Sequence, residues 1–274
     1  MASAINFIFG KAFDLLLFPF KNMNPWVGMI VVSLLTALLM LWVYKYSSNQ
    51  EGIKKVKDKI KAHLLELRLY KDNFQVTLQA QKKILGYNAK YMFYALKPML
   101  VMMIPIVLIL IQLDLWFGCR PLKPGESALL KVTMEQSPLQ SDLTVQPSPG
   151  IQIETPALRM EDEKEIDWRV KGLQEGLHAL TFKVDNQSFT KQVVVSANPF
   201  AKVSTARVRN QFLDRLIDPG EPAIPQNVPV TKVEIAYAPH DLNFFGYAIN
   251  WLIAFFILSI IFGFGLKGFF HIEV

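Results

Sequence analysis

Three long apolar runs dominate the pattern of hydrophobic and polar positions along this chain. They cover residues 25–44, 99–117 and 243–266, and only the second contains a charged residue. A helix of about 20 residues crosses the hydrocarbon core of a bilayer. Trp26 and Tyr44 lie at the two ends of the first run, as expected for aromatic residues at headgroup depth. Three such runs are difficult to accommodate in a soluble core, so we expect a membrane α-helical protein with three transmembrane helices.

The 24 residues before the first run have an amphipathic pattern. Apolar residues recur at helical spacing around Lys11 and Asp14 until Pro19. Residues 1–24 therefore predict a helix that lies in the outer membrane interface. A frayed extension of the first span is the alternative.

Residues 45–98 predict a helical hairpin with a coiled-coil seam. Apolar positions separated by three or four residues are typical of such a seam. Lys71-Asp72-Asn73 is a plausible turn. The seam residues expected before and after this turn are Ile53, Val56, Ile60, Leu64, Leu67, Phe74, Leu78 and Leu85.

After Cys119 the periodicity changes from helical to alternating. Residues 118–198 predict a small antiparallel β-sandwich of Ig-like type, with a tight turn at Asp185-Asn186. The Cys pair of true Ig domains is absent, so only the architecture is predicted. Residues 199–242 predict a proline-rich connector that contains a short helix and one further strand.

Charge is distributed unevenly between the spans. Residues 45–97 contain twelve Lys and Arg but only four Asp and Glu, whereas residues 118–242 contain 14 basic and 16 acidic residues. The positive-inside rule places the short basic loop in the cytoplasm. The N-terminus and residues 118–242 are then outside, and residues 267–274 form a cytoplasmic tail. A bacterial inner membrane is the expected location, with the endoplasmic reticulum as the alternative.

Composition argues against an enzyme. One cysteine and four scattered histidines leave no disulfide framework or cysteine-based zinc site. Residues 263–268 fit the spacing GxGxxG, but they end a predicted transmembrane helix and leave no room for a βαβ unit, so close helix packing is the preferred interpretation. We expect no catalytic residue, no metal and no cofactor.

Polar residues inside the predicted spans are the first candidate site. Polar groups are costly in hydrocarbon and often mark functional positions. One interpretation is hydrogen bonding between helices, and the other is a hydrated groove open to the cytosol and to lipid. The candidate groove residues are Ser33, Thr36, Asn250 and Ser259.

Basic residues flanking the hairpin seam are the second candidate site. They suit a solvated helical face that also sets the topology, or attraction to anionic lipid headgroups. They also suit contact with a nascent chain or a ribosome, whose RNA would be attracted without recognition of its sequence. The candidate contact residues are Lys54, Lys55, Lys57, Lys61, Arg68, Lys82 and Lys83.

The organisation up to the second span resembles the Oxa1/YidC insertase superfamily. The resemblance rests on Phe13-Asp14-Leu15 with Phe18-Pro19-Phe20, on residues 60–67, and on residues 91–106. The span count is most similar to the three-span branch that contains EMC3/TMCO1-like and archaeal YidC-like proteins. Two features depart from it, because no Lys or Arg lies in a span and an outer β-domain replaces a short connection.

The resemblance implies an insertase-like membrane chaperone that assists the insertion or folding of membrane proteins. Its expected partners are membrane lipid, nascent or client membrane proteins and the ribosome. A structural or accessory subunit of a larger membrane complex, docked through the outer β-domain, is the alternative function.

Overall fold

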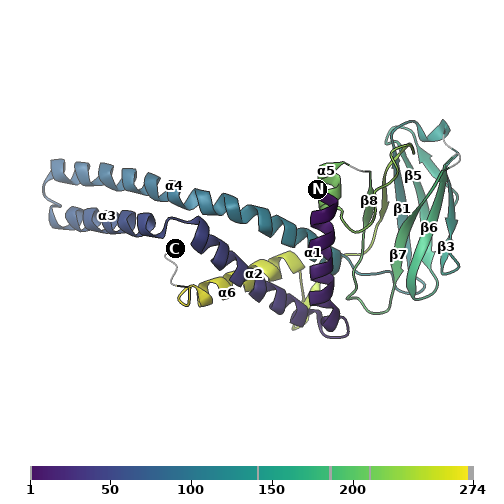
Figure 1. Cartoon of the computed structure of the whole chain (residues 1–274), viewed down its shortest axis with the longest axis horizontal. Helices are drawn as coiled ribbons and strands as arrows, with labels where there is room; N and C mark the ends of the chain where they lie inside the picture. The colour runs from purple at the N-terminus through teal and green to yellow at the C-terminus, as the bar shows by residue number, and fades with distance from the viewer. Residues whose placement is uncertain (1, 141, 185–186, 210, 271–274) are drawn as a thin grey trace. The chain divides into compact units, whose positions relative to one another are not determined.

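The computed structural model describes residues 2–140, 142–184, 187–209 and 211–270 (Figure 1). The chain divides into two compact units. The first unit comprises residues 1–28 and 108–254, and the second comprises residues 29–107 and 255–274. Each unit is described by itself below.

The second unit is helical. Among the described residues, two helical segments are long and apolar enough to cross a bilayer, namely Pro25–Ser47 and Phe74–Gly118. Near the ends of these segments the chain passes into the first unit. The helices that contribute to the second unit are α2 (Pro25–Ser47), α3 (Gln50–Leu69), α4 (Phe74–Leu113) and α6 (Trp251–Leu266).

The helix α4 joins the hairpin to the second apolar run without a break. It has 40 residues and contains Pro98 and Pro105, although the sequence places a boundary between residues 98 and 99. Proline is tolerated in membrane helices because neighbouring groups satisfy the freed backbone carbonyls. A five-residue π-helix, η2 (Asp114–Gly118), then ends the segment.

The third apolar run is helical only in part, which corrects the expected start of the third span. Residues ahead of α6 form a two-stranded hairpin of β10 (Leu242–Phe244) and β11 (Tyr247–Ile249). Its turn places Phe245 at φ 49° and Gly246 at φ 91°, and the Gly246 N–H donates to Asn243 Oδ1 at 2.9 Å. The helix that follows has 16 residues.

The seam of α3 differs from the expected one at one position. Ile53 and Val56 are buried, but Leu64 is 52% exposed and His63 takes its place. The His63 ring stacks on Tyr87 of α4 with centroids 5.6 Å apart. Strict alternation of three- and four-residue steps from Ile53 passes through residue 63, which explains why the seam excludes Leu64.

The seam expected on α4 is wrong. Phe74, Leu78 and Leu85 are exposed, between 55% and 77% of each side chain. Ala80 is instead fully buried, and steps of three and four residues from it reach Tyr87. The buried face of α4 thus runs through Ala80, Ile84 and Tyr87. The expected seam residues Phe74, Leu78 and Leu85 face outward.

The first unit contains a β-domain of two antiparallel sheets. One sheet has the order β3-β5-β1-β9-β8, with β4 also paired to β5, and the other has the order β2-β6-β7. The strands are β1 (Ser127–Met134), β2 (Thr144–Pro147), β3 (Ile151–Ile153), β4 (Leu158–Met160), β5 (Glu165–Gly172), β6 (Gly176–Val184), β7 (Gln187–Val195), β8 (Ala206–Val208) and β9 (Val230–Ile235).

The two sheets share one hydrophobic core, to which Val132 and Ile166 contribute from the larger sheet and Phe182 and Val193 from the smaller one. The predicted turn Asp185-Asn186 lies outside the described residues, but β6 and β7 pair on both sides of it.

The β-domain extends beyond the expected boundary at residue 198. Both β8 and β9 come from the segment expected to be a connector, and β9 pairs with β1. The strand β1 therefore lies inside its sheet, whereas the first strand of an Ig sandwich lies at an edge. The connector also holds the short helix α5 (Phe212–Ile217).

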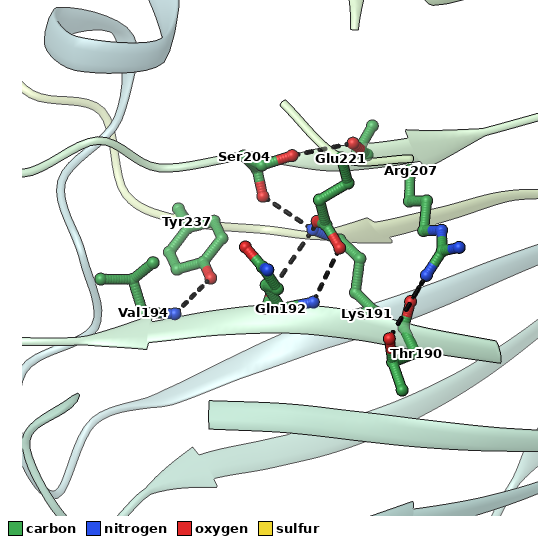
Figure 2. A network of polar contacts seen from close by, with 9 residues as sticks. Thr190, Lys191, Gln192, Val194, Ser204, Arg207, Glu221 and Tyr237 are labelled. Atoms are coloured by element: carbon green, nitrogen blue, oxygen red, sulfur yellow. Dashed lines mark hydrogen bonds and ion pairs between the residues drawn. The ribbon is translucent and has the colours of Figure 1, made fainter. Parts of the chain in front are cut away.

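A buried ion pair fastens the connector to β7 (Figure 2). Lys191 and Glu221 have almost no exposed side-chain surface, and Lys191 Nζ donates to Glu221 Oε1. Lys191 Nζ also donates to the Ser204 carbonyl at 2.8 Å, and the Gln192 N–H donates to Glu221 Oε2 at 2.9 Å. Burial lowers the pKa of Lys191, an effect that Glu221 opposes.

The N-terminal helix packs on the same segment of the first unit. The helix α1 (Ala2–Leu17) continues into the short 3₁₀ helix η1 (Phe18–Phe20). Asp14 Oδ1 lies 2.7 Å from Lys202 Nζ, and Asn6 Nδ2 donates to the Arg215 carbonyl at 2.5 Å. These contacts hold α1 beside the connector.

Candidate functional site

A cavity of about 320 Å³ lies among α2, α4 and α6, entirely within the second unit. Each helix presents one face to it, because the lining residues recur at three- and four-residue steps. From α2 these are Thr36, Ala37, Met40, Leu41 and Tyr44, from α4 they are Met102 and Ile106, and from α6 onward they are Phe256, Ser259, Ile260, Gly263, Phe264 and Lys267.

Two of the four predicted groove residues line this cavity. Thr36 of α2 and Ser259 of α6 lie in a wall whose other residues are apolar except for Tyr44 and Lys267. The Ser259 Oγ is buried and has no hydrogen-bond partner among the residues described. An unpaired buried hydroxyl of this kind is costly, since helical serines commonly bond to the carbonyl four residues earlier.

Ser33 lies one turn before Thr36, but it does not line the cavity. Its side chain is fully buried, and its Oγ also lacks a partner within the described part of the chain. An unpaired buried hydroxyl costs about 1–3 kcal/mol. Ser33 is therefore an internal polar group of the second unit and not a wall residue.

Asn250 is not a groove residue, which corrects the sequence expectation. It is exposed, belongs to the first unit and precedes α6 directly. Its Oδ1 accepts from the Leu252 N–H at 2.9 Å, and its carbonyl accepts from the Ala254 N–H. A short polar side chain at this position satisfies free amides at a helix start.

Lys267 is a cavity residue that sequence reasoning missed. It follows α6 directly, lines the cavity, and places its Nζ 5.0 Å from the centroid of the Phe264 ring. Ser259, Gly263 and Lys267 are four residues apart, so they share one helical face. That spacing, continued past the end of the apolar run, is the signal that could have identified Lys267.

The glycines of the GxGxxG stretch do not pack against a neighbouring helix. A Cβ atom added at Gly263, Gly265 or Gly268 would meet nothing within 4 Å in the described structure. The expected close packing is therefore not observed. Gly263 instead widens the cavity wall between Ser259 and Lys267.

The predicted basic contact residues lie on α3 and α4 of the hairpin. Lys54, Lys55, Lys61, Arg68, Lys82 and Lys83 are exposed. Lys57 differs, because it is half-buried and its Nζ lies 5.9 Å from the centroid of the Tyr91 ring. The hairpin thus presents positive charge beside the exposed apolar residues Leu64, Leu65, Phe74 and Leu78.

The described residues contain no group of three or more His, Cys, Asp and Glu that could hold a metal ion. Residues 14–142 match the family model described as integral membrane protein EMC3/TMCO1-like. This match covers the end of α1, both long apolar helices, the hairpin and the first strand of the β-domain. No curated protein and no solved structure matches the chain.

Proposed function

We propose that this chain, which belongs over residues 14–142 to the EMC3/TMCO1-like family within the Oxa1/YidC superfamily, is an insertase-like membrane chaperone. That family is associated with membrane protein insertion. The observation that carries the proposal is the cavity among α2, α4 and α6, where Thr36, Ser259 and Lys267 add polar groups to an apolar wall.

The cavity would lower the cost of moving a short polar segment of a client across the bilayer. A charged residue at the centre of a membrane helix costs about 2.5–3.5 kcal/mol on insertion scales. The hydroxyl groups of Thr36 on α2 and Ser259 on α6 would offer hydrogen bonds in place of lost water. Lys267 would offer a positive charge to acidic residues of the client. Neither a nucleotide nor a metal takes part.

The hairpin would receive the client on the cytoplasmic side. Exposed lysines attract the ribosome or an acidic nascent chain through long-range electrostatics. The exposed leucines and Phe74 provide an apolar surface next to this charge, suited to a transmembrane segment before it enters the membrane. Both features lie on the same pair of helices.

The third span in this proposal is α6. Sixteen residues at 1.5 Å each give about 24 Å, which is less than the roughly 30 Å hydrocarbon core. A short helix thins the bilayer around it. Local thinning beside the cavity shortens the apolar path that a client segment must cross. The exposed Phe245 and Tyr247 of the preceding hairpin suit the outer headgroup region.

The proposed topology has the N-terminus and the β-domain outside, α1 in the outer interface, and the hairpin and the C-terminus in the cytoplasm of a bacterial cell. Single cysteines at Lys71 and Lys183, in a chain whose Cys119 is replaced by serine, test this arrangement. A membrane-impermeant thiol reagent added outside should label residue 183 and not residue 71. The reverse pattern would exclude the proposal.

Insertion of a reporter with a short, charged outer tail tests the function. Thr36→Leu with Ser259→Leu should lower its insertion about 10-fold or more, since each hydroxyl contributes about 1 kcal/mol. Asn250→Ser, which keeps a helix cap, and Ser33→Ala, which removes a hydroxyl away from the cavity, are the matched controls. If the Thr36/Ser259 variant inserts the reporter as well as the two controls do, the cavity takes no part in insertion.

A further inference from the structure

A second apolar face runs along α4 on the side away from α3. The helix α3 lies along one side of the first half of α4 (Figure 1), where Ala80 is buried and the Tyr87 ring stacks on His63. Leu78 and Leu85 precede Ala80 and Tyr87 by two positions, which places them about 200° around the helix. The outer row of α4 on this face consists of five residues, each at least 49% exposed, namely Phe74, Leu78, Leu85, Met92 and Leu96.

The outer row has the spacing of a coiled-coil seam. Leu78, Leu85 and Met92 follow one another at seven-residue steps. Phe74 precedes Leu78 by four residues, and Leu96 follows Met92 by four. A face with this repeat suits the apolar side chains of another amphipathic helix.

Positive charge flanks the outer row on one side. The helix α4 contains no Asp or Glu, and its basic residues are Lys82, Lys83, Lys90 and Lys97. All of these except Lys83 lie about 40–120° from Leu78 in one direction around the helix. The other flank carries the uncharged amides Gln81 and Asn88. The apolar row is therefore bordered by cations along one edge.

The acids of the hairpin lie elsewhere, on α3 and in the turn, and they are Glu51, Asp58, Glu66 and Asp72. Glu51 pairs with Lys55, and Glu66 Oε2 lies 2.6 Å from His63 Nδ1. The hydrogen bond with His63 lowers the pKa of Glu66, and the charge of Lys83 adds to this effect. Asp58 lies about 200° from the buried Val56, on the side of α3 away from α4. None of the four acids lies on the basic flank of the outer row.

The outer row begins far from the bilayer. Leu78 and Leu85 precede residue 99, where the proposed second span begins, by about 32 and 21 Å of continuous helix. Headgroups extend only about 5–8 Å beyond the hydrocarbon core on each side. A lipid surface therefore does not reach these leucines.

Charge and apolarity together distinguish the remaining occupants. Two copies of the outer row would bring lysines toward lysines, with no acid on either α4 to offset the repulsion. RNA would bind the lysines through its phosphates but leave Leu78 and Leu85 exposed to water. A helix with an apolar seam and acidic flanks matches both features of the surface.

We propose that the outer row of α4 docks an amphipathic helix of a cytoplasmic protein, whose apolar seam is flanked by Asp or Glu. The seam packs on Leu78 and Leu85, and the carboxylates face Lys82, Lys90 and Lys97. This proposal rests on the cytoplasmic hairpin of the proposed function and names a further partner for it. Its test measures binding and not insertion, so failure of one proposal is distinguishable from failure of the other.

Two synthetic 21-residue helical peptides serve as probes. Both carry leucine at the seam positions, and they differ only in having Glu or Gln at the flanking positions. Fluorescence anisotropy measures their binding to the full-length protein in phosphatidylcholine nanodiscs, with empty nanodiscs as the blank. The Glu peptide should bind at least about 10-fold more tightly than the Gln peptide at low salt, because three surface charge pairs together contribute about that factor.

Two variants separate the contributions of charge and apolar packing. Lys82→Gln with Lys90→Gln and Lys97→Gln should weaken the Glu peptide about 10-fold and leave the Gln peptide unchanged. Leu78→Gln with Leu85→Gln should weaken both peptides at least about 10-fold, since both bury the same leucines.

Matched controls change the same residue types on α3. Lys54→Gln with Lys55→Gln and Lys61→Gln, and separately Leu64→Gln with Leu65→Gln, should each keep the affinity for the Glu peptide within about twofold. Thermal unfolding of every variant shows whether it retains the native fold.

Three results would overturn the proposal. Equal affinity of the unmodified protein for the two peptides would assign the outer row to uncharged segments, such as transmembrane segments of clients. Unchanged binding of the Glu peptide to a folded Leu78/Leu85 variant would show that charge alone suffices, as it does for RNA. A dimer of the unmodified protein that light scattering detects, and that the Leu78/Leu85 variant loses, would assign the row to a second copy.

Discussion

Cys119 and Pro239 lie opposite each other in an antiparallel bridge, next to a 3.0 Å hydrogen bond from the Arg120 N–H to the Ala238 carbonyl. The chain thus enters and leaves the β-domain at one point. Every residue of the domain's hydrophobic core cluster lies between residues 122 and 237. The β-domain is an insertion whose two ends meet at this bridge, and its connector also contacts the rest of the first unit through Lys202 and Phe200.

The adjacent ends allow the domain to be excised and the chain to be rejoined. Replacement of residues 121–237 by a two-residue Asn-Gly turn should leave reporter insertion within about twofold of the unmodified protein, since the proposed groove lies in the second unit. The alternative function, an accessory subunit docked through the β-domain, makes the opposite prediction, because excision would then release a co-purifying complex. Insertion assays and affinity purification of the same variant distinguish the two outcomes.

Excision also removes Phe200, which packs on Phe117 with centroids 4.9 Å apart, and Lys202, the partner of Asp14. A matched control therefore keeps the domain but carries Phe200→Ala. If the excision variant and Phe200→Ala both lose insertion, the defect lies in the packing of the second apolar helix. If only the excision variant loses insertion, the result contradicts the insertion role of the spans.

The basic hairpin should set ribosome affinity through charge. Replacement of Lys54, Lys61, Lys82 and Lys83 by glutamine should weaken binding to ribosomes at least about 10-fold at low salt and flatten its dependence on salt concentration. Four lysines of the β-domain replaced by glutamine provide the control. If ribosome binding by the hairpin variant depends on salt as in the unmodified protein, the charge of the hairpin acts in topology alone.

The pair of Lys191 and Glu221 should tolerate joint replacement better than the loss of one member (Figure 2). Lys191→Met leaves a buried carboxylate unpaired and should cost about 3–5 kcal/mol in the free energy of unfolding. Lys191→Met with Glu221→Leu should recover most of that loss. Thermal unfolding of the full chain in detergent measures the loss of stability in each variant. A double variant whose loss equals the sum of the two single losses would contradict the coupling.

Acid should weaken the β-domain through Glu126. Two hydrogen bonds from Arg120, at 2.6 and 2.7 Å, lower the pKa of Glu126 from 4.5 to about 2. Because the folded pKa lies below the unfolded one, this stabilisation is complete above about pH 4.5 and is lost as pH falls toward 2. Both side chains are partly exposed, which limits the effect to about 1 kcal/mol.

Glu126→Gln should remove this part of the pH dependence and lower stability at neutral pH by a similar amount. Unfolding followed by tryptophan fluorescence between pH 2 and 7 measures both quantities. If the unmodified protein and Glu126→Gln lose stability identically as pH falls, other carboxylates control the acid sensitivity.

The sequence was most informative where one physical signal dominates. Apolar runs of sufficient length predicted α2 and the second half of α4, and alternation predicted most strands of the β-domain. The pairing of β9 with β1 joins residues about 100 positions apart, and no local pattern reveals such a partner.

Local ambiguity explains the remaining differences. Phe244 and Tyr247 increase the apolar character of the third run whether they form a helix or a hairpin, so hydropathy alone placed the start of the helix too early. Asn250 was a boundary signal, since a polar residue at the edge of an apolar run commonly caps a helix. The hairpin seam was misassigned because Ala80 and His63 contribute to it although neither is a large apolar residue.

Photocrosslinking from the cavity wall tests the central claim most directly. A photoreactive residue at Met40, which lines the cavity, should crosslink to a stalled client chain whose polar segment is crossing the membrane. The same residue at Leu39, the exposed neighbour on α2, should crosslink mainly to lipid. Crosslinks to the client of equal strength from both positions, or from Leu39 alone, would contradict a groove among α2, α4 and α6.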